Sequence, residues 1–263
     1  MSRAAMTIHG FLTDVNDFGR LYDYLDFYDE VVKCEIPGHN GEVDFSKFNV
    51  EDTVSVITHT FDRLKKKHGK VDVIGFSMGG ALASYICATR QVNKAVLLSP
   101  SNKYINLRSA VTSIKFYLRY LTGTFSKTKG ALKERISETY SGFAPYKKNI
   151  DLSAQVAIKR ILPNISAHTF NVFRTLMNIA DDAVEKSAPV SVPTFMLWGN
   201  LDELVPKSSV QFIEEHFSSC ETKLIEDLGH AMLMTNKDNI LIGEIVNFLT
   251  DGEIQVDVPL KED

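Results

Sequence analysis

The chain has 263 residues with 44% hydrophobic and 24% charged side chains and a formal net charge of −4, values that are ordinary for a globular protein. We expect one α/β domain with an insertion and no nucleic-acid partner. No apolar run approaches the length of a membrane-spanning helix, about 18 residues, and the N-terminus lacks the apolar stretch and cleavage site of a signal peptide. A cytoplasmic protein is therefore expected.

Strands and helices alternate along most of the chain. Strands are predicted near residues 4–8, 31–36, 71–75, 94–98, 193–198 and 222–226, and helices near 14–26, 50–67, 78–90, 207–217 and 237–249. This alternation predicts a mostly parallel sheet of about six strands with helices on both faces. Residues 252–263 are polar and acidic, and we expect them to form an exposed tail.

Residues 101–190 interrupt the alternation and are predicted to form a helical lid, inserted in a core made by residues 1–100 and 191–263. Lid helices are expected at 107–122 and at 155–177, the second interrupted by Pro163. The segment carries 14 Lys and Arg residues against 6 Asp and Glu. Solvated lysines, or docking on the acidic core, explain this charge most simply; the alternative is a weak contact with anionic lipids.

The sequence Gly75-Phe76-Ser77-Met78-Gly79-Gly80 is the most informative part of the chain. It is a Gly-x-Ser-x-Gly motif between a predicted strand and a predicted helix. Such a sharp turn forces the serine into strained backbone angles, and the flanking glycines remove the collisions that side chains would cause. The motif alone is common, but in this context it predicts Ser77 as an exposed nucleophile.

A serine attacks efficiently when a base accepts its proton and an acid orients the base. Asp202 follows the strand that ends in Trp198-Gly199, and His230 follows a strand and a loop. In a parallel sheet both fall at the carboxyl edge that carries Ser77. Glu203 is the chief rival of Asp202, and Asp227 lies nearer to His230 in the chain.

Six other histidines compete with His230 for the role of base. His59 and His68 belong to a polar helix and are expected to be solvated, and His216 lies where a cation suits a helix dipole. His9 and His39 lie near the site, and we expect them to be structural hydrogen-bonding groups. The remaining histidine is His168.

An oxyanion hole needs two N–H groups directed at the developing negative charge. The amide of Met78, at the start of a helix, is one candidate. The other is the amide of Phe11 in Thr7-Ile8-His9-Gly10-Phe11, where glycine allows the backbone to approach an acyl group closely.

Together these segments resemble an α/β-hydrolase of the carboxylesterase and monoacylglycerol-lipase type. The matching pieces are His9-Gly10-Phe11, Ile36-Pro37-Gly38-His39, the Ser77 motif, Trp198-Gly199-Asn200-Leu201-Asp202 with Val205-Pro206, and Gly229-His230. The order serine, aspartate, histidine is that of the family. Two features depart from it: Asn40 replaces the usual glycine after His39, and we expect the two leading strands common in the family to be missing, since the chain starts on the strand that leads to His9.

The resemblance implies a serine esterase that needs no cofactor and acts on a small-molecule ester. Cys34, Cys87 and Cys220 have unrelated spacings, which predicts reduced thiols and no metal site. Aromatic residues in the predicted lid favour an apolar pocket for short-to-medium acyl chains. The same triad serves C–C bond hydrolases, thioesterases and amidases, and similar proteins act as small-molecule receptors with slow turnover. The substrate and the oligomeric state stay open.

Overall fold

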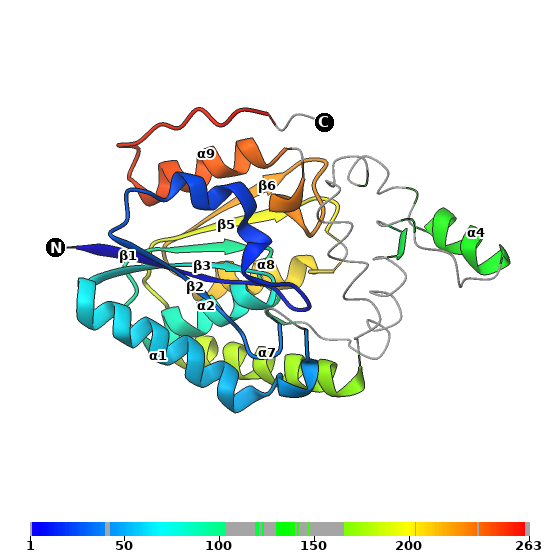
Figure 1. Cartoon of the computed structure of the whole chain (residues 1–263), viewed down its shortest axis with the longest axis horizontal. Coiled ribbons are helices and arrows are strands. Elements are labelled where there is room, and N and C mark those ends of the chain that lie inside the picture. Colours follow the sequence, from blue (N-terminus) through cyan, green and yellow to red (C-terminus); the bar gives the residue numbers. More distant parts are fainter. Residues whose placement is uncertain are drawn as a thin grey trace.

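Six parallel strands form one sheet in the computed structural model, in the order β2-β1-β3-β4-β5-β6 (Figure 1). They are β1 (Arg3–Ile8), β2 (Glu30–Cys34), β3 (Lys70–Phe76), β4 (Ala95–Leu98), β5 (Thr194–Gly199) and β6 (Cys220–Ile225). The structure describes residues 2–39, 43–103, 119–120, 123, 130–139, 141, 147, 166–202, 204–235 and 237–260. The predicted α/β class and all six predicted strands are confirmed.

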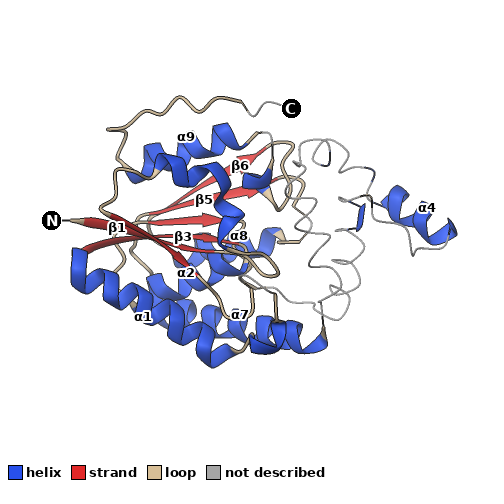
Figure 2. Cartoon of the chain, in the orientation of Figure 1, coloured by secondary structure: helices blue, strands red, loops and turns tan. Residues whose placement is uncertain are grey.

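Helices cover both faces of this sheet (Figure 2). One layer contains α1 (Val50–His68), α2 (Met78–Thr89), α7 (Ala167–Ser187) and α8 (Lys207–His216), and the other contains the 3₁₀ segment η1 (Val15–Tyr24), η5 (Met232–Met234) and α9 (Asp238–Leu249). The short η2 (Phe45–Lys47) precedes α1, and α4 (Gly130–Thr139) stands apart from the sheet. The helix predicted at 14–26 is a 3₁₀ segment with a kink at Gly19, which has a φ of 45°.

Helix α1 shows how the sequence sets the ends of an element. Asn49 caps its first turn by accepting a hydrogen bond from the amide of Asp52, and Gly69 ends it with a φ of 78°. Acidic residues in the first turn and basic residues in the last turn match the helix dipole. The chain then enters β3 directly, which leads to the Ser77 motif.

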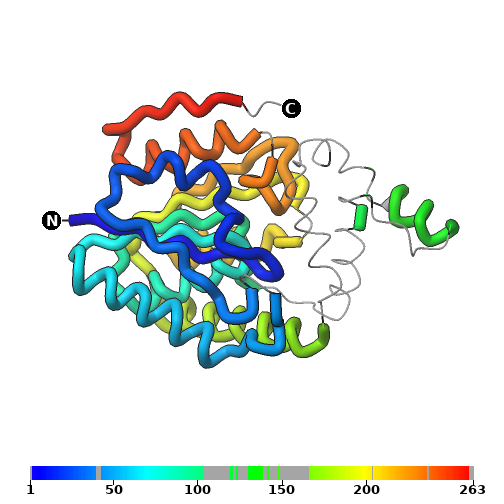
Figure 3. The backbone as a smooth tube through the Cα atoms, viewed as in Figure 1, coloured from blue at the N-terminus to red at the C-terminus, as the bar shows by residue number. Residues whose placement is uncertain are grey.

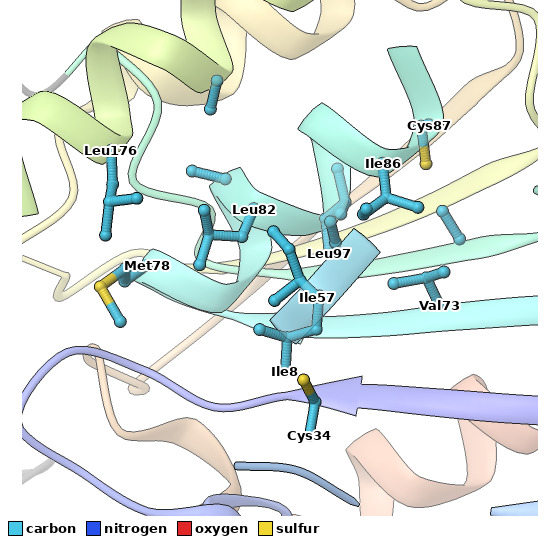
Figure 4. Packing of buried hydrophobic residues seen from close by; sticks show 14 of the residues in the cluster. Ile8, Cys34, Ile57, Val73, Met78, Leu82, Ile86, Cys87, Leu97 and Leu176 are labelled. Atoms are coloured by element: carbon cyan, nitrogen blue, oxygen red, sulfur yellow. The ribbon is translucent and has the colours of Figure 1, made fainter. Parts of the chain in front are cut away.

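The two layers bury two separate apolar clusters. Side chains from α1, α2, α7 and α8 pack on one face of the sheet, and Figure 4 shows part of that cluster, including Ile57, Leu82 and Leu176. Side chains from η1 and α9 fill the other face. Because both faces are covered, the central strands are buried along almost their whole length, as parallel strands usually are.

The predicted exposed tail is partly wrong. The described residues from Gly252 onward run back along η1 and α9 (Figure 3), and Val258 is buried in the second cluster. Arg20 of η1 donates a hydrogen bond to the carbonyl of Pro259 and also pairs with Asp238 of α9. Apolar side chains within a polar segment therefore hold this part of the chain against the core.

Most of the predicted lid, residues 101–190, lies outside the described residues, so its boundaries stay a prediction. Within that range, α7 begins after Ser166, whose hydroxyl caps the amide of Thr169. Its apolar face, with Phe170, Leu176 and Ala180, belongs to the same cluster as α2. Helix α7 therefore packs against α2, the helix that follows Ser77, within the same layer.

Candidate active site

Ser77 lies on the turn between β3 and α2 with a φ of 55° and a ψ of −116°. A side chain at two neighbouring positions would make this turn impossible. A Cβ on Gly75 would lie 2.2 Å from the Gly79 carbonyl oxygen, and one on Gly79 would lie 1.9 Å from the Ile8 carbonyl oxygen. The glycines of the motif therefore allow α2 to approach β1 and β3 closely, and the strain predicted for Ser77 is present.

Three side chains from three loops meet at the carboxyl edge of the sheet. The Ser77 hydroxyl lies 2.7 Å from His230 Nε2, and His230 Nδ1 lies 3.0 Å from Asp202 Oδ2. All three groups are largely buried, and the Asp202 side chain is fully buried. Since a carboxylate only accepts hydrogen bonds, Nδ1 carries the proton and Nε2 is left to accept the serine hydrogen.

The backbone around Asp202 holds the acid in place. Its Oδ1 accepts the amides of Leu204 and Val205, each at 2.9 Å, which leaves Oδ2 for the histidine. The Leu201 amide donates to the Leu228 carbonyl at 2.9 Å, so the acid loop and the histidine loop are tied directly to each other. Of the rivals, Asp227 has an exposed side chain 3.8 Å from Lys237, and Glu203 lies outside the described residues.

The other histidines are placed differently. His9 and His39 are buried, and burial lowers the pKa of His9 to about 4 and that of His39 to about 3. The expectation that His68 is solvated is wrong. Its ring is buried, with Nε2 2.9 Å from Glu30, because β2 lies beside the end of α1. His59 is exposed, as expected.

Both amides expected in the oxyanion hole lie at the same edge as Ser77. Met78 is the first residue of α2, and Phe11 follows β1 by three residues. Among the described residues, neither amide donates to a protein acceptor. The Ile36 amide donates to His9 Nε2, so His9 Nδ1 donates to the Gly10 carbonyl at 2.9 Å and fixes the peptide unit that contains the Phe11 N–H.

The family model of the alpha/beta hydrolase fold matches residues 8–237 of the chain. The protein belongs to the α/β-hydrolase family. This confirms the resemblance inferred from the sequence motifs.

Curated relatives of this hydrolase are distant but cover most of its length. It is 22% identical to a pimeloyl-[acyl-carrier protein] methyl ester esterase of Neisseria meningitidis, over 88% of each chain. It is 21% identical to the human monoacylglycerol lipase ABHD6, over 87% of this chain and 70% of the relative. These relatives support the prediction of a carboxylesterase-type hydrolase.

Solved structures share the fold at still lower identity. A structure from a study of the metagenome-derived lipolytic enzymes LipS and LipT superimposes on the hydrolase with a TM-score of 0.64 and 14% identity, over 95% of this chain and 94% of the other. MenH from S. aureus gives a TM-score of 0.61 and 17% identity, over 96% and 95% of the two chains. At this identity the likeness shows the fold alone.

One carboxylate of the hydrolase's site was missed by sequence reasoning. Asp17 of η1 is buried, and its Oδ2 accepts the Gly10 amide at 2.8 Å and the Thr13 hydroxyl. Burial raises its pKa to about 7, against the lowering effect of these two hydrogen bonds. The sequence predicted only a helix near residues 14–26, and no signal in the chain indicated this role for Asp17.

Aromatic side chains gather beside the Phe11 amide of the hydrolase. The Phe11 ring stacks on Phe173 with 4.6 Å between ring centroids and meets Phe170 edge-on at 5.3 Å. The ring centroid of Phe48 lies 6.1 Å from that of Phe11. Phe11, Phe48, Phe170 and Phe173 thus form an aromatic wall around the side chain of the candidate oxyanion donor.

The described residues offer no group of three His, Cys, Asp or Glu side chains placed to bind a metal ion. Within the same part of the chain, no helix combines the length and the apolar character needed to cross a membrane.

Proposed function

We propose that this α/β-hydrolase is a serine esterase that cleaves carboxylic esters through Ser77, His230 and Asp202. The observation that carries the proposal is the continuous hydrogen-bonded relay from Ser77 through His230 to Asp202, with distances of 2.7 and 3.0 Å. These are the distances at which a proton passes between a nucleophile and its base.

In the first step, Ser77 attacks the ester carbonyl while His230 Nε2 takes the hydroxyl proton. Asp202 holds the imidazole in the required tautomer and stabilises the positive charge that forms on it. The buried position of Asp202 strengthens this interaction because little water screens it. His230 then donates the proton to the leaving alcohol, and an acyl group remains on Ser77.

The oxyanion is held by the amides of Phe11 and Met78 in this proposal. In the second step, water attacks the acyl-enzyme while His230 again acts as base, and the acid product leaves. Each amide of such a hole typically contributes about 10²–10³-fold to kcat.

Short-to-medium acyl esters are the proposed substrates. The aromatic wall formed by Phe11, Phe48, Phe170 and Phe173 supports an apolar acyl group rather than a charged one. The relatives' names point to esters of different alcohols, a methyl ester and a monoacylglycerol. Weak contact of the basic segment 101–190 with anionic lipid is the alternative to solvated lysines, and the same substrates in anionic vesicles test it.

Hydrolysis of p-nitrophenyl esters from acetate to palmitate tests the proposal, with Ser77→Ala measured alongside. We expect multiple turnover with a maximum at one acyl length and its loss in the variant. Near-normal hydrolysis by Ser77→Ala would refute the assignment. A single burst that then stalls would instead favour a receptor-like protein, and p-nitroanilides, thioesters and C–C substrates would then follow.

A further inference from the structure

The turn that carries the Phe11 amide has an unfavourable backbone shape. Leu12, the residue after Phe11, has a φ of 65°, in the left-handed region that is costly for a branched, non-glycine side chain. Such a conformation persists only where surrounding contacts determine it. Leu12 is also buried, so its side chain packs in the core while its backbone is strained.

One carboxylate contacts both ends of this turn. Oδ2 of Asp17 accepts the Gly10 amide at 2.8 Å, at the start of the turn, and the Thr13 hydroxyl, at its end. The turn is also tightly packed, since a Cβ on Gly10 would lie 3.1 Å from both the Phe76 ring and the Thr13 hydroxyl. Phe11 and Leu12 are therefore enclosed between two hydrogen bonds to a single oxygen.

Asp17 is 3% exposed, and few charges surround it. Asp14 on the same turn is a like charge that raises the pKa of Asp17, and His230, from the loop after β6, lowers it. Tyr22 of η1 is the other titratable neighbour; its hydroxyl bonds Thr7 and the Val15 carbonyl. A buried carboxylate with no direct cationic partner described is costly, which indicates a role beyond stability.

We propose that Asp17 is a positioning residue for the oxyanion hole, which holds the strained Gly10–Thr13 turn so that the Phe11 amide points at the reacting oxygen. This inference rests on the proposed function. Hydrogen bonds to an ionised carboxylate are shorter and stronger than those to a neutral one, so the ionised form of Asp17 holds the turn more firmly. With a pKa of about 7, Asp17 gains this form as the pH rises through neutrality.

The test is steady-state hydrolysis of the best p-nitrophenyl ester by Asp17→Asn, with rates divided by the concentration of sites that a fluorophosphonate labels. We expect kcat to fall about 10- to 100-fold and KM to change by less than about twofold, because the amide acts on the transition state. Asp14→Asn is the matched control. It neutralises the neighbouring carboxylate, which bonds the Asn16 amide instead, and should keep kcat within about twofold at pH 8.

The pH profile provides a readout that a purely structural role would not change. In the wild type, the ionisation of Asp17 should add a step near pH 7 to the acid limb of kcat/KM. Asp17→Asn should lose this step. Thr13→Val removes a hydrogen bond that lowers the pKa of Asp17, so the step near pH 7 should move to higher pH, and Asp14→Asn should move it to lower pH.

The inference is overturned if Asp17→Asn has an unchanged kcat and an acid limb as steep as that of the wild type. The proposed function is tested separately, because it still stands if Ser77→Ala is inactive. If Asp17→Asn does not fold, the Thr13→Val profile decides: a step that moves upward supports the inference, and an unmoved step overturns it.

Discussion

Lowering the pH from 7 to 5 should have two opposing effects on the stability of this fold. His9 and His39 stay neutral when folded, since burial lowers their pKa values to about 4 and about 3 from an ordinary value of 6.5. The unfolded chain binds more protons at these sites as the pH falls, so stability is lost below pH 6.5. At pH 5 each histidine accounts for a loss of about 2 kcal/mol.

Asp17 contributes to the pH dependence of stability with the opposite sign. Its folded pKa of about 7 lies above the unfolded value of 3.8, so the folded state binds the extra proton between these two values. Stability from this group is therefore present at low pH and is lost as the pH rises through 7. Between pH 7 and pH 5 it should offset about 2 kcal/mol of the histidine loss.

Asp17→Asn removes this offset and leaves the two histidines unopposed. From these three groups, the wild type should lose about 2 kcal/mol of unfolding free energy between pH 7 and pH 5, and the variant about 4 kcal/mol. Urea unfolding, followed by fluorescence of the single tryptophan, Trp198, measures both values. Asp14→Asn, on the same turn but less buried, is the control. Equal pH dependence in the wild type and Asp17→Asn would refute the reasoning.

Three substitutions, two of them with a matched control substitution, test other parts of the structure. Asp202→Asn should lower kcat by about 10⁴-fold with little change in stability, because the amide favours the wrong tautomer of the base; a loss below tenfold would contradict the role of the acid. Gly79→Ala should destabilise the fold by about 3 kcal/mol or more in urea unfolding, since its methyl group would lie 1.9 Å from a backbone oxygen of β1. The same change at Gly243 of α9, where nothing lies within 4 Å, should stabilise by up to about 1 kcal/mol, and equal effects at the two sites would contradict the packing described. Asp72→Ala should cost about 3–5 kcal/mol, because Arg3, Tyr28 and Asn93 lose the buried carboxylate to which they donate. Asp62→Ala, at an exposed ion pair, should cost less than about 1 kcal/mol.

The strands and the order of the site residues could be predicted because they depend on local patterns. Apolar runs bounded by glycine and polar residues marked β3 and β5, and parallel strands bring the residues that follow them to one edge. The placement of Ser77, Asp202 and His230 follows from this edge. The glycines around Ser77 could be interpreted from the sequence because the turn itself leaves no room for side chains at these positions.

Burial of ionisable groups could not be predicted in the same way, since it depends on partners far along the chain. His68 meets Glu30, 38 residues away, although its own helix is polar. Asp17 is buried in η1, which packs against η5, more than 200 residues later in the chain. The last described residues likewise pack through Val258 against η1 and α9. The polar composition around Val258 gave no indication of this contact.

Covalent labelling with a fluorophosphonate, read by intact mass and peptide mapping, tests the central claim most directly. We expect one adduct per chain on Ser77, no adduct in Ser77→Ala, and labelling slowed by about 10³-fold or more in His230→Ala, since the base that activates the serine is gone. An adduct at another residue, or labelling of the wild type no faster than of His230→Ala, would contradict it.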